Sequence, residues 1–203
     1  MSALLDDYDN NVICIQSDDA SLKGEPQLMF IYTSSAQPRR CDTWETPTRS
    51  LDMLLKHLDP AVHFIWEPFP GSGHSTRHLR SRGFQVTNGD DPDFFRQSVP
   101  VAPSEMRLVL VSNPPFSIKR DILSHLQELG VHEVALLLPA PVLFTKYFRE
   151  YCQSHHVQLV IHSKRCAFLD PISGKAGGSA SFDIAWICVG LGLPRDVNFP
   201  AAM

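Results

Sequence analysis

The sequence predicts an α/β fold with a mostly parallel central sheet. Three observations lead to this prediction: short apolar runs alternate with helical patterns, Gly or Pro stands at many of their ends, and no internal repeat is visible. At 203 residues and 43% hydrophobic, the chain can form one globular domain with a sizeable core. We assign residues 41–203 to this domain and residues 1–40, which are polar and acidic, to an N-terminal extension or arm.

Apolar residues at helical spacing predict four main helices, at residues 48–58, 75–82, 118–129 and 143–152. Thr46 and Pro47 fit the N-cap and first turn of the first helix, and Gly83 and Gly130 fit the ends of the second and third. A shorter helix is expected around residues 93–97. Short apolar or mainly apolar segments predict six strands, at residues 62–66, 84–88, 107–112, 133–138, 157–161 and 182–189, and the run Leu108–Val111 is unbroken. The Gly/Ser-rich stretch before the last strand, residues 170–181, is expected to be a loop.

The net charge of −4 argues against a nucleic-acid binder that relies on overall charge. It leaves room for a local basic surface, because short clusters of cations occur along the chain. Taken singly, most such clusters are solvated surface. The fold could bring together Arg39-Arg40, Lys119-Arg120, Lys146 with Arg149, and Lys164-Arg165.

The five cysteines show no CxxC spacing, which is typical of free thiols in a reducing compartment. No apolar run approaches the length that spans a bilayer, and the first residues lack the basic region of a secretory signal. We therefore expect a cytoplasmic or nuclear protein that does not act at a membrane. The nine histidines show no metal-ligand spacing, so no metal is expected.

A glycine turn follows the first strand. Glu67-Pro-Phe-Pro-Gly71-Ser-Gly73 places small residues between a strand and a helix, where a ligand can approach the backbone. Asp90 follows at the end of the next strand, where it could bind ribose hydroxyls, and Asp91 is an alternative to it. Alone, this pattern also fits a tight turn, and it is not the GxGxxG of a dinucleotide site.

A second turn, Asn113-Pro114-Pro115-Phe116, follows the strand at residues 107–112. Two prolines fix the backbone, and neither has an N–H, so their carbonyls can accept hydrogen bonds from another group. In a doubly wound sheet this turn opens on the same edge as the glycine turn. The two turns are therefore expected to border one pocket.

Residues 67–73 and 113–116 resemble the cofactor and catalytic motifs of S-adenosylmethionine-dependent amino-group methyltransferases, especially the N6-adenine enzymes. Residues 43–47, Thr-Trp-Glu-Thr-Pro, resemble the segment that precedes the glycine motif in many of them and contacts the methionine end of the cofactor. The Gly/Ser loop before residues 182–189 resembles their late loop beside the target base. The resemblance covers roughly residues 43–190, in the motif order of the gamma arrangement.

The resemblance implies a class I methyltransferase Rossmann-like fold with a final antiparallel strand and helices on both faces. It implies S-adenosylmethionine as cofactor, bound by Trp44, Glu45, Thr46, Pro47, Glu67, Pro68, Phe69, Gly71, Ser72, Gly73, Asp90, Asp91 and Asn113. The implied catalytic residues are Asn113, Pro114, Pro115 and Phe116, and the substrate-binding candidates are Phe116, Lys119, Arg120, Phe168 and Phe182. For Phe168 and Phe182, core packing is the competing interpretation.

The implied activity is methylation of adenine N6 in DNA or RNA, with the target base flipped into the Asn-Pro-Pro-Phe pocket. Only about 65 residues separate this motif from the last strand, so there is no inserted domain to read a sequence. The substrate would then be single-stranded nucleic acid or structured RNA, or recognition would involve a partner subunit, a homodimer or weak specificity. Alternatives are a protein glutamine-N5 methyltransferase, which usually has Tyr where this chain has Phe116, and a non-catalytic cofactor-binding subunit.

Overall fold

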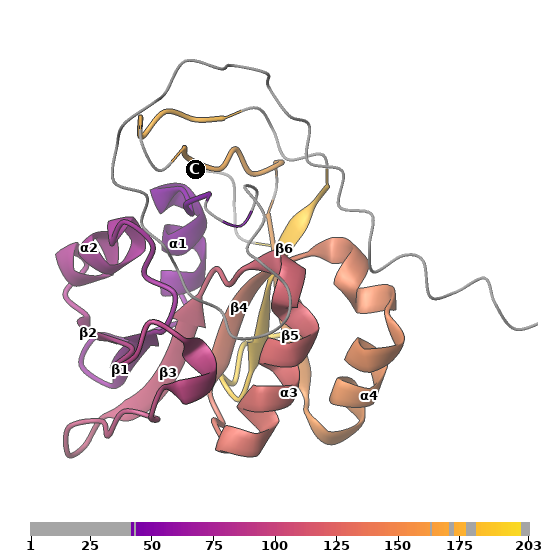
Figure 1. The fold of residues 1–203 in the computed structure, drawn as a ribbon, viewed down its shortest axis with the longest axis horizontal. Helices are drawn as coiled ribbons and strands as arrows, with labels where there is room; N and C mark the ends of the chain where they lie inside the picture. Colours follow the sequence, from indigo (N-terminus) through magenta and orange to yellow (C-terminus); the bar gives the residue numbers. More distant parts are fainter. Residues whose placement is uncertain (1–41, 43, 163, 171–172, 178–181, 200–203) are drawn as a thin grey trace, which may run out of the picture.

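One sheet of seven strands, in the order β2-β1-β3-β4-β6-β5-β7, runs through the part of the chain that the structure describes (Figure 1). The structure is a computed structural model that describes residues 42, 44–162, 164–170, 173–177 and 182–199. The predicted arm, residues 1–40, lies outside the described residues. The strands are β1 His63–Glu67, β2 Gln85–Asn88, β3 Arg107–Ser112, β4 Val134–Pro139, β5 Val157–Ile161, β6 Ile184–Val189 and β7 Val197–Asn198.

The sheet is mixed but mostly parallel. Strands β2, β1, β3 and β4 pair in parallel, while β6 lies antiparallel between β4 and β5. The predicted fold class, a class I Rossmann-like sheet with a late antiparallel strand, is confirmed. One detail differs: β6 is not the last strand, because the two-residue β7 follows it and pairs in parallel with β5.

Helices cover both faces of the sheet. The α-helices are α1 Thr48–Leu55, α2 His74–Ser81, α3 Lys119–Leu129 and α4 Lys146–Ser154, and the 3₁₀ helices are η3 Phe94–Arg96, η4 Phe116–Ile118 and η5 Ala140–Phe144. Helix α2 connects β1 to β2 on one side of β1 in the sheet. Helix α3 connects β3 to β4 in the opposite direction along the sheet. Because such crossovers are right-handed, the two helices lie on opposite faces. Figure 1 shows α1 and α2 on one side of the sheet and α3 and α4 on the other.

The core is densest along β3, β4 and β6. Every residue of β4 and β6 is buried, as expected for central strands that are covered on both faces. The two largest fully buried side chains are Trp66 and Trp186. Trp186 donates its indole N–H to the carbonyl of Ser50 at 3.0 Å, which joins β6 to α1. This bond fixes the helix that follows the predicted cofactor segment.

The N-cap of the first helix and the start of the fourth helix differ from the prediction. Pro47, not Thr46, is the N-cap of α1, and the Thr46 hydroxyl has no hydrogen-bond partner among the described residues. The fourth helix begins at Lys146, because the preceding residues form η5 and the Thr145 hydroxyl accepts from the N–H of Phe148. Gly130 ends α3 in the left-handed conformation, as predicted. None of the described helices is long and apolar enough to cross a membrane.

Candidate active site

The two predicted turns meet at the point where the strand order reverses. Strands β1 and β3 are neighbours, with Trp66 opposite Leu110, and from them the chain continues to opposite sides of the sheet. In open α/β sheets, ligands bind beyond the carboxyl ends of the strands at this switch point. Glu67 ends β1 and Asn113 directly follows β3, so the structure brings both predicted motifs to the carboxyl ends of two neighbouring strands.

The glycine turn has the backbone geometry that only glycine adopts without strain. Gly71 has φ +54° and Gly73 has φ +81°, both in the left-handed region. Gly73 is the N-cap of α2, and its N–H donates to the carbonyl of Pro70 at 2.7 Å. The N–H of Ser72 donates to Glu45 Oε1 at 3.0 Å. The turn is therefore held against the predicted cofactor segment by the Glu45 side chain.

Glu67 is fully buried at the end of β1. Its Oε1 accepts from the N–H of Phe69 at 3.0 Å and from the hydroxyl of Ser112, the last residue of β3. Burial raises the pKa of Glu67 to about 8, although these two hydrogen bonds act in the opposite direction. The carboxyl group is therefore mostly protonated at neutral pH and joins the ends of β1 and β3.

Asn113 has one satisfied and one unsatisfied polar atom. Its Nδ2 donates to the carbonyl of Trp44 at 3.1 Å, which fixes the orientation of the amide because that partner is an acceptor. Its Oδ1 is buried without a hydrogen-bond partner among the described residues. Of the two proline carbonyls predicted to be free, that of Pro115 accepts from the N–H of Ile118 at 3.3 Å. Pro114 thus keeps the role of candidate acceptor.

Three phenylalanines form an aromatic cluster beside Asn113. Phe116 meets Phe168 and Phe182 edge to face, with ring centroids 6.1 Å and 5.9 Å away. Phe116 and Phe168 are buried and Phe182 is half-buried. The structure therefore brings both predicted neighbours of Phe116 to it, and such edge-to-face pairs contribute roughly 0.5–1.5 kcal/mol each beyond burial.

The segment around residues 44–47 lies against the late loop. Glu45 and Leu169 exchange two backbone hydrogen bonds of 2.9 Å. The ring of Trp44 packs against Gly177, where any Cβ would overlap it. Gly177 in turn donates its N–H to the carbonyl of Phe168 at 2.9 Å. The predicted late loop thus reaches the site through its described residues, while residues 171–172 and 178–181 lie outside them.

Asp90 and Asp91, the two residues predicted to bind ribose, lie just beyond β2, and each carboxylate accepts a hydrogen bond from a backbone N–H. Asp90 is exposed and accepts from the N–H of Ser98 at 3.0 Å, which lowers the pKa of its carboxyl. Asp91 accepts from the N–H of Asp93 at 2.8 Å. The side chain of Gln97 donates to the carbonyls of Pro68 and Asp91, at 3.1 Å and 2.7 Å, and so links the glycine turn to this loop.

The remaining candidates have less specific surroundings. The ring of Phe69 packs on Phe94, with centroids 4.8 Å apart, and so faces the core. Pro47 is the N-cap of α1. Lys119 and Arg120 are the first two residues of α3, and Arg120 is exposed. The roles of Lys119 and Arg120 in substrate binding stay predictions.

Sequence reasoning missed two buried polar residues that connect parts of the candidate site, Ser112 and Gln97. Ser112 had a usable signal, since a serine that ends an otherwise apolar strand needs a buried partner. Gln97 had none, because its two acceptors are carbonyls that only the fold brings near.

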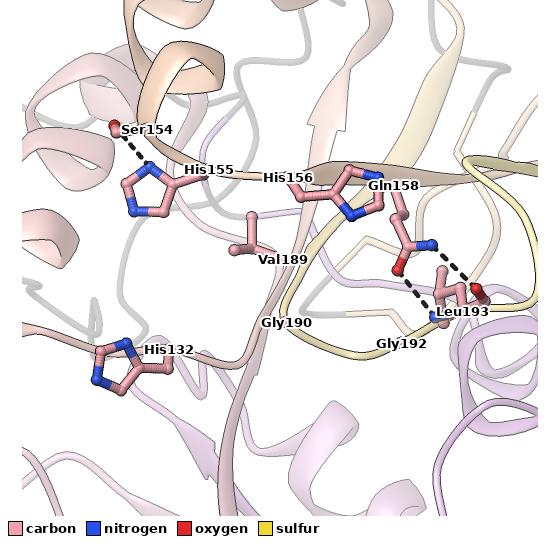
Figure 2. A pocket seen from close by; sticks show the side chains of 9 residues that line it. All are labelled: His132, Ser154, His155, His156, Gln158, Val189, Gly190, Gly192 and Leu193. Atoms are coloured by element: carbon pink, nitrogen blue, oxygen red, sulfur yellow. Dashed lines mark hydrogen bonds between the residues drawn. The ribbon is translucent and has the colours of Figure 1, made fainter.

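A surface hollow lies at the opposite end of the strands, near the amino ends of β4 and β5 (Figure 2). It measures about 510 Å³ and is lined in part by His132, His155 and His156. Several of its polar groups pair within the lining: His155 with Ser154, and Gln158 with the backbone of Leu193. His156 pairs instead with Asp196, at 2.8 Å. No group of three or more His, Cys, Asp or Glu among the described residues could hold a metal ion.

Comparison with known proteins yields structural likeness only. No family model and no curated protein matches the chain. A 23S rRNA methyltransferase, ErmE, superposes with a TM-score of 0.46 at 16% identity, over 74% of this chain and 68% of that one. A predicted O-methyltransferase, Atu636 from Agrobacterium tumefaciens, gives 0.36 at 15% identity, over 73% and 84%. Because both TM-scores lie below 0.5, the fold assignment rests on the strand order and connectivity.

Proposed function

We propose that this protein is an S-adenosylmethionine-dependent methyltransferase that modifies the N6 amino group of adenine in DNA or RNA. The observation that carries the proposal is the amide of Asn113, whose Nδ2 is bound to the Trp44 carbonyl while its Oδ1 is buried without a partner among the described residues. An unpaired buried acceptor costs about 1–3 kcal/mol. An N–H donor from a substrate would remove this cost.

The residues at these strand ends fit the proposed cofactor. Thr46 carries a buried hydroxyl that has no partner in the described part of the chain, two residues from the carbonyl that holds Asn113. The left-handed glycines let a ligand approach the backbone at the start of α2. The residues that would hold the cofactor are Trp44, Glu45, Thr46, Pro47, Glu67, Gly71, Ser72, Gly73 and Asp90 or Asp91. Bound there, S-adenosylmethionine supplies an electrophilic methyl group.

The chain's own contribution to the reaction is to position and polarise the amino group. The lone pair of an exocyclic adenine nitrogen is delocalised into the ring, so the nitrogen is a weak nucleophile. Asn113 Oδ1 and the Pro114 carbonyl would each accept one N–H of this group and favour a pyramidal nitrogen. Both oxygens would also stabilise the positive charge that develops on the nitrogen, which is differential binding of the transition state.

The aromatic cluster supports a nucleobase as the substrate. Phe116 would stack on the base, which is worth about 1–3 kcal/mol, while Phe168 and Phe182 orient its ring. The glutamine alternative is less well supported, since a cluster of three phenyl rings suits a flat base better than a carboxamide chain. A base in a duplex would have to be flipped out to reach this position.

The test is transfer of a tritiated methyl group from S-adenosylmethionine to single-stranded DNA, duplex DNA, RNA and a protein extract, followed by nucleoside mass spectrometry. The expected product is N6-methyladenine. Asn113→Ala should lower the rate by about 10²–10³-fold, as loss of one transition-state hydrogen bond does, and leave cofactor affinity nearly unchanged. Label in protein alone would support the glutamine alternative, and cofactor binding without any label would support the non-catalytic subunit.

A further inference from the structure

We propose that a second, smaller surface hollow binds a phosphodiester group of the nucleic-acid substrate beside the target base. This hollow, which we call the basic hollow, measures about 200 Å³ and lies between the start of α1 and the segment after β5. Its lining residues are Pro47, Arg49, Ser50, Met53, His162, Lys164, Arg165, Cys166 and Ala167. The inference rests on the proposed function and adds to it a binding site for the substrate backbone.

The basic hollow has the charge of an anion site. Its lining residues include three cations and no carboxylate, in a chain whose net charge is −4. Arg165 pairs with Asp183 at 3.3 Å, whereas no described carboxylate lies within ion-pair distance of Arg49 or Lys164. Two cations therefore remain to attract an anion.

The shape of the basic hollow fits a phosphate group. Ser50 and Cys166 are buried in its floor, while Arg49 and Lys164 are exposed. At about 30 Å³ for each water, the hollow has room for roughly six water molecules, enough to admit a tetrahedral anion. His162 is hydrogen-bonded to Ser50 at 3.2 Å, and burial together with the charge of Arg49 lowers its pKa to about 4. This ring is therefore neutral at pH 7 and adds no charge of either sign.

The basic hollow adjoins the candidate active site along two segments. Pro47, in the hollow, is three residues from Trp44, whose carbonyl binds Asn113, so it lies within about 11 Å of Trp44 along the chain. Ala167, also in the hollow, directly precedes Phe168, whose ring contacts Phe116. A strand whose adenine occupies the pocket would pass its neighbouring phosphates over this surface. A free anion would gain nothing from this proximity.

The test measures how the affinity for nucleic acid depends on salt. Wild type, Arg49→Gln, Lys164→Gln and the double variant would be titrated against fluorescein-labelled single-stranded RNA and DNA of about 12 nucleotides, at about 50 to 200 mM salt. Lys56→Gln is the matched control, because Lys56 is an exposed cation just beyond the other end of α1. Cofactor affinity would be measured by calorimetry for each protein.

Each substitution in the basic hollow should lower the slope of log K against log salt by about 0.7, the value for one single-strand phosphate contact, and the double variant should lower it by about 1.4. The matching loss of affinity is about fivefold per contact near 0.1 M salt. Lys56→Gln should change neither quantity.

Three results would overturn the inference while leaving the proposed function intact. The first is a wild type that methylates and binds nucleic acid while both hollow variants keep its salt slope. The second is a rise in the cofactor dissociation constant at an unchanged slope, which would assign the hollow to the cofactor carboxylate. The third is equal competition by inorganic phosphate and by an oligonucleotide of the same phosphate concentration, which would reduce the hollow to a site for free anions. A wild type that binds and methylates no nucleic acid would overturn both proposals.

Discussion

Glu67→Gln is expected to remove a pH dependence from the stability of the fold. The pKa of Glu67 rises from 4.5 to about 8 in the folded protein, so the folded state keeps a proton that the unfolded chain has lost. The stabilisation from this proton is complete below pH 4.5 and is lost as the pH rises to 8. The free energy of unfolding should fall by about 1.4 kcal/mol per pH unit in this window, or about 5 kcal/mol in total.

The glutamine side chain preserves the local hydrogen bonds, because Ser112 and the N–H of Phe69 both donate to the same oxygen of Glu67. The variant should therefore gain stability relative to the wild type as the pH rises from about 5 to 8, with no further gain above 8. Other groups titrate in this range as well. His162, with its pKa lowered to about 4, acts with the opposite sign between pH 4 and 6.5. Such contributions are the same in both proteins, so they cancel in the difference between the unfolding free energies of the variant and the wild type.

The assay is urea unfolding at several pH values between about 5 and 9, followed by the fluorescence of the buried tryptophans Trp66 and Trp186. A difference in unfolding free energy that stays constant over this range would refute a protonated Glu67. A wild type that gains stability over the variant with rising pH would indicate an ionised, paired carboxylate instead.

Substitutions at three other positions test the site. Asp90→Ala should weaken cofactor binding about tenfold in calorimetry, as expected for loss of a hydrogen bond to a charged group, and unchanged affinity would remove Asp90 from the site. Phe116→Ala should cost about 1–3 kcal/mol of substrate binding in fluorescence titrations, and Phe116→Tyr clearly less, whereas equal losses would argue against stacking. Gly177→Ala should displace the ring of Trp44, shift the tryptophan emission and lower stability by about 1–3 kcal/mol in urea unfolding; an unaltered spectrum would contradict the close packing.

The sequence predicted those elements whose signals are local. The strand at residues 107–112 and the strand at 157–161 have the bounds expected from their apolar runs. A short run rich in Val, Leu and Ile identifies a strand both where most residues are buried, as in β3, and where buried and half-buried residues alternate, as in β5. Gly130 marked the end of α3 through its left-handed conformation. By contrast, the apolar residues of η5 fit both a 3₁₀ and an α-helical pattern, and only the bond from Phe148 to Thr145 fixes where α4 begins.

The candidate site was predictable at the level of motifs and not at the level of contacts. Both turns could be placed at one sheet edge, since the alternation of strands and helices implies a doubly wound sheet. The bond between Glu67 and Ser112 joins residues 45 positions apart, and that between Asn113 and Trp44 joins residues 69 positions apart. Neither pairing leaves a pattern in the sequence. The sequence likewise could not predict that the buried Oδ1 of Asn113 has no hydrogen-bond partner among the described residues, because this depends on the positions of all the donors around it.

Glu45 and its neighbour Trp44 connect three parts of the candidate site that are distant in sequence. The Glu45 side chain binds the N–H of Ser72 in the glycine turn, and its backbone pairs with Leu169 beside the aromatic cluster. The carbonyl of Trp44 holds the amide of Asn113. Because these bonds converge on two consecutive residues, we expect a movement of the glycine turn to be transmitted to the support of the Asn113 amide. The proposed cofactor side and the proposed amino-group side of the candidate site therefore share one structural support.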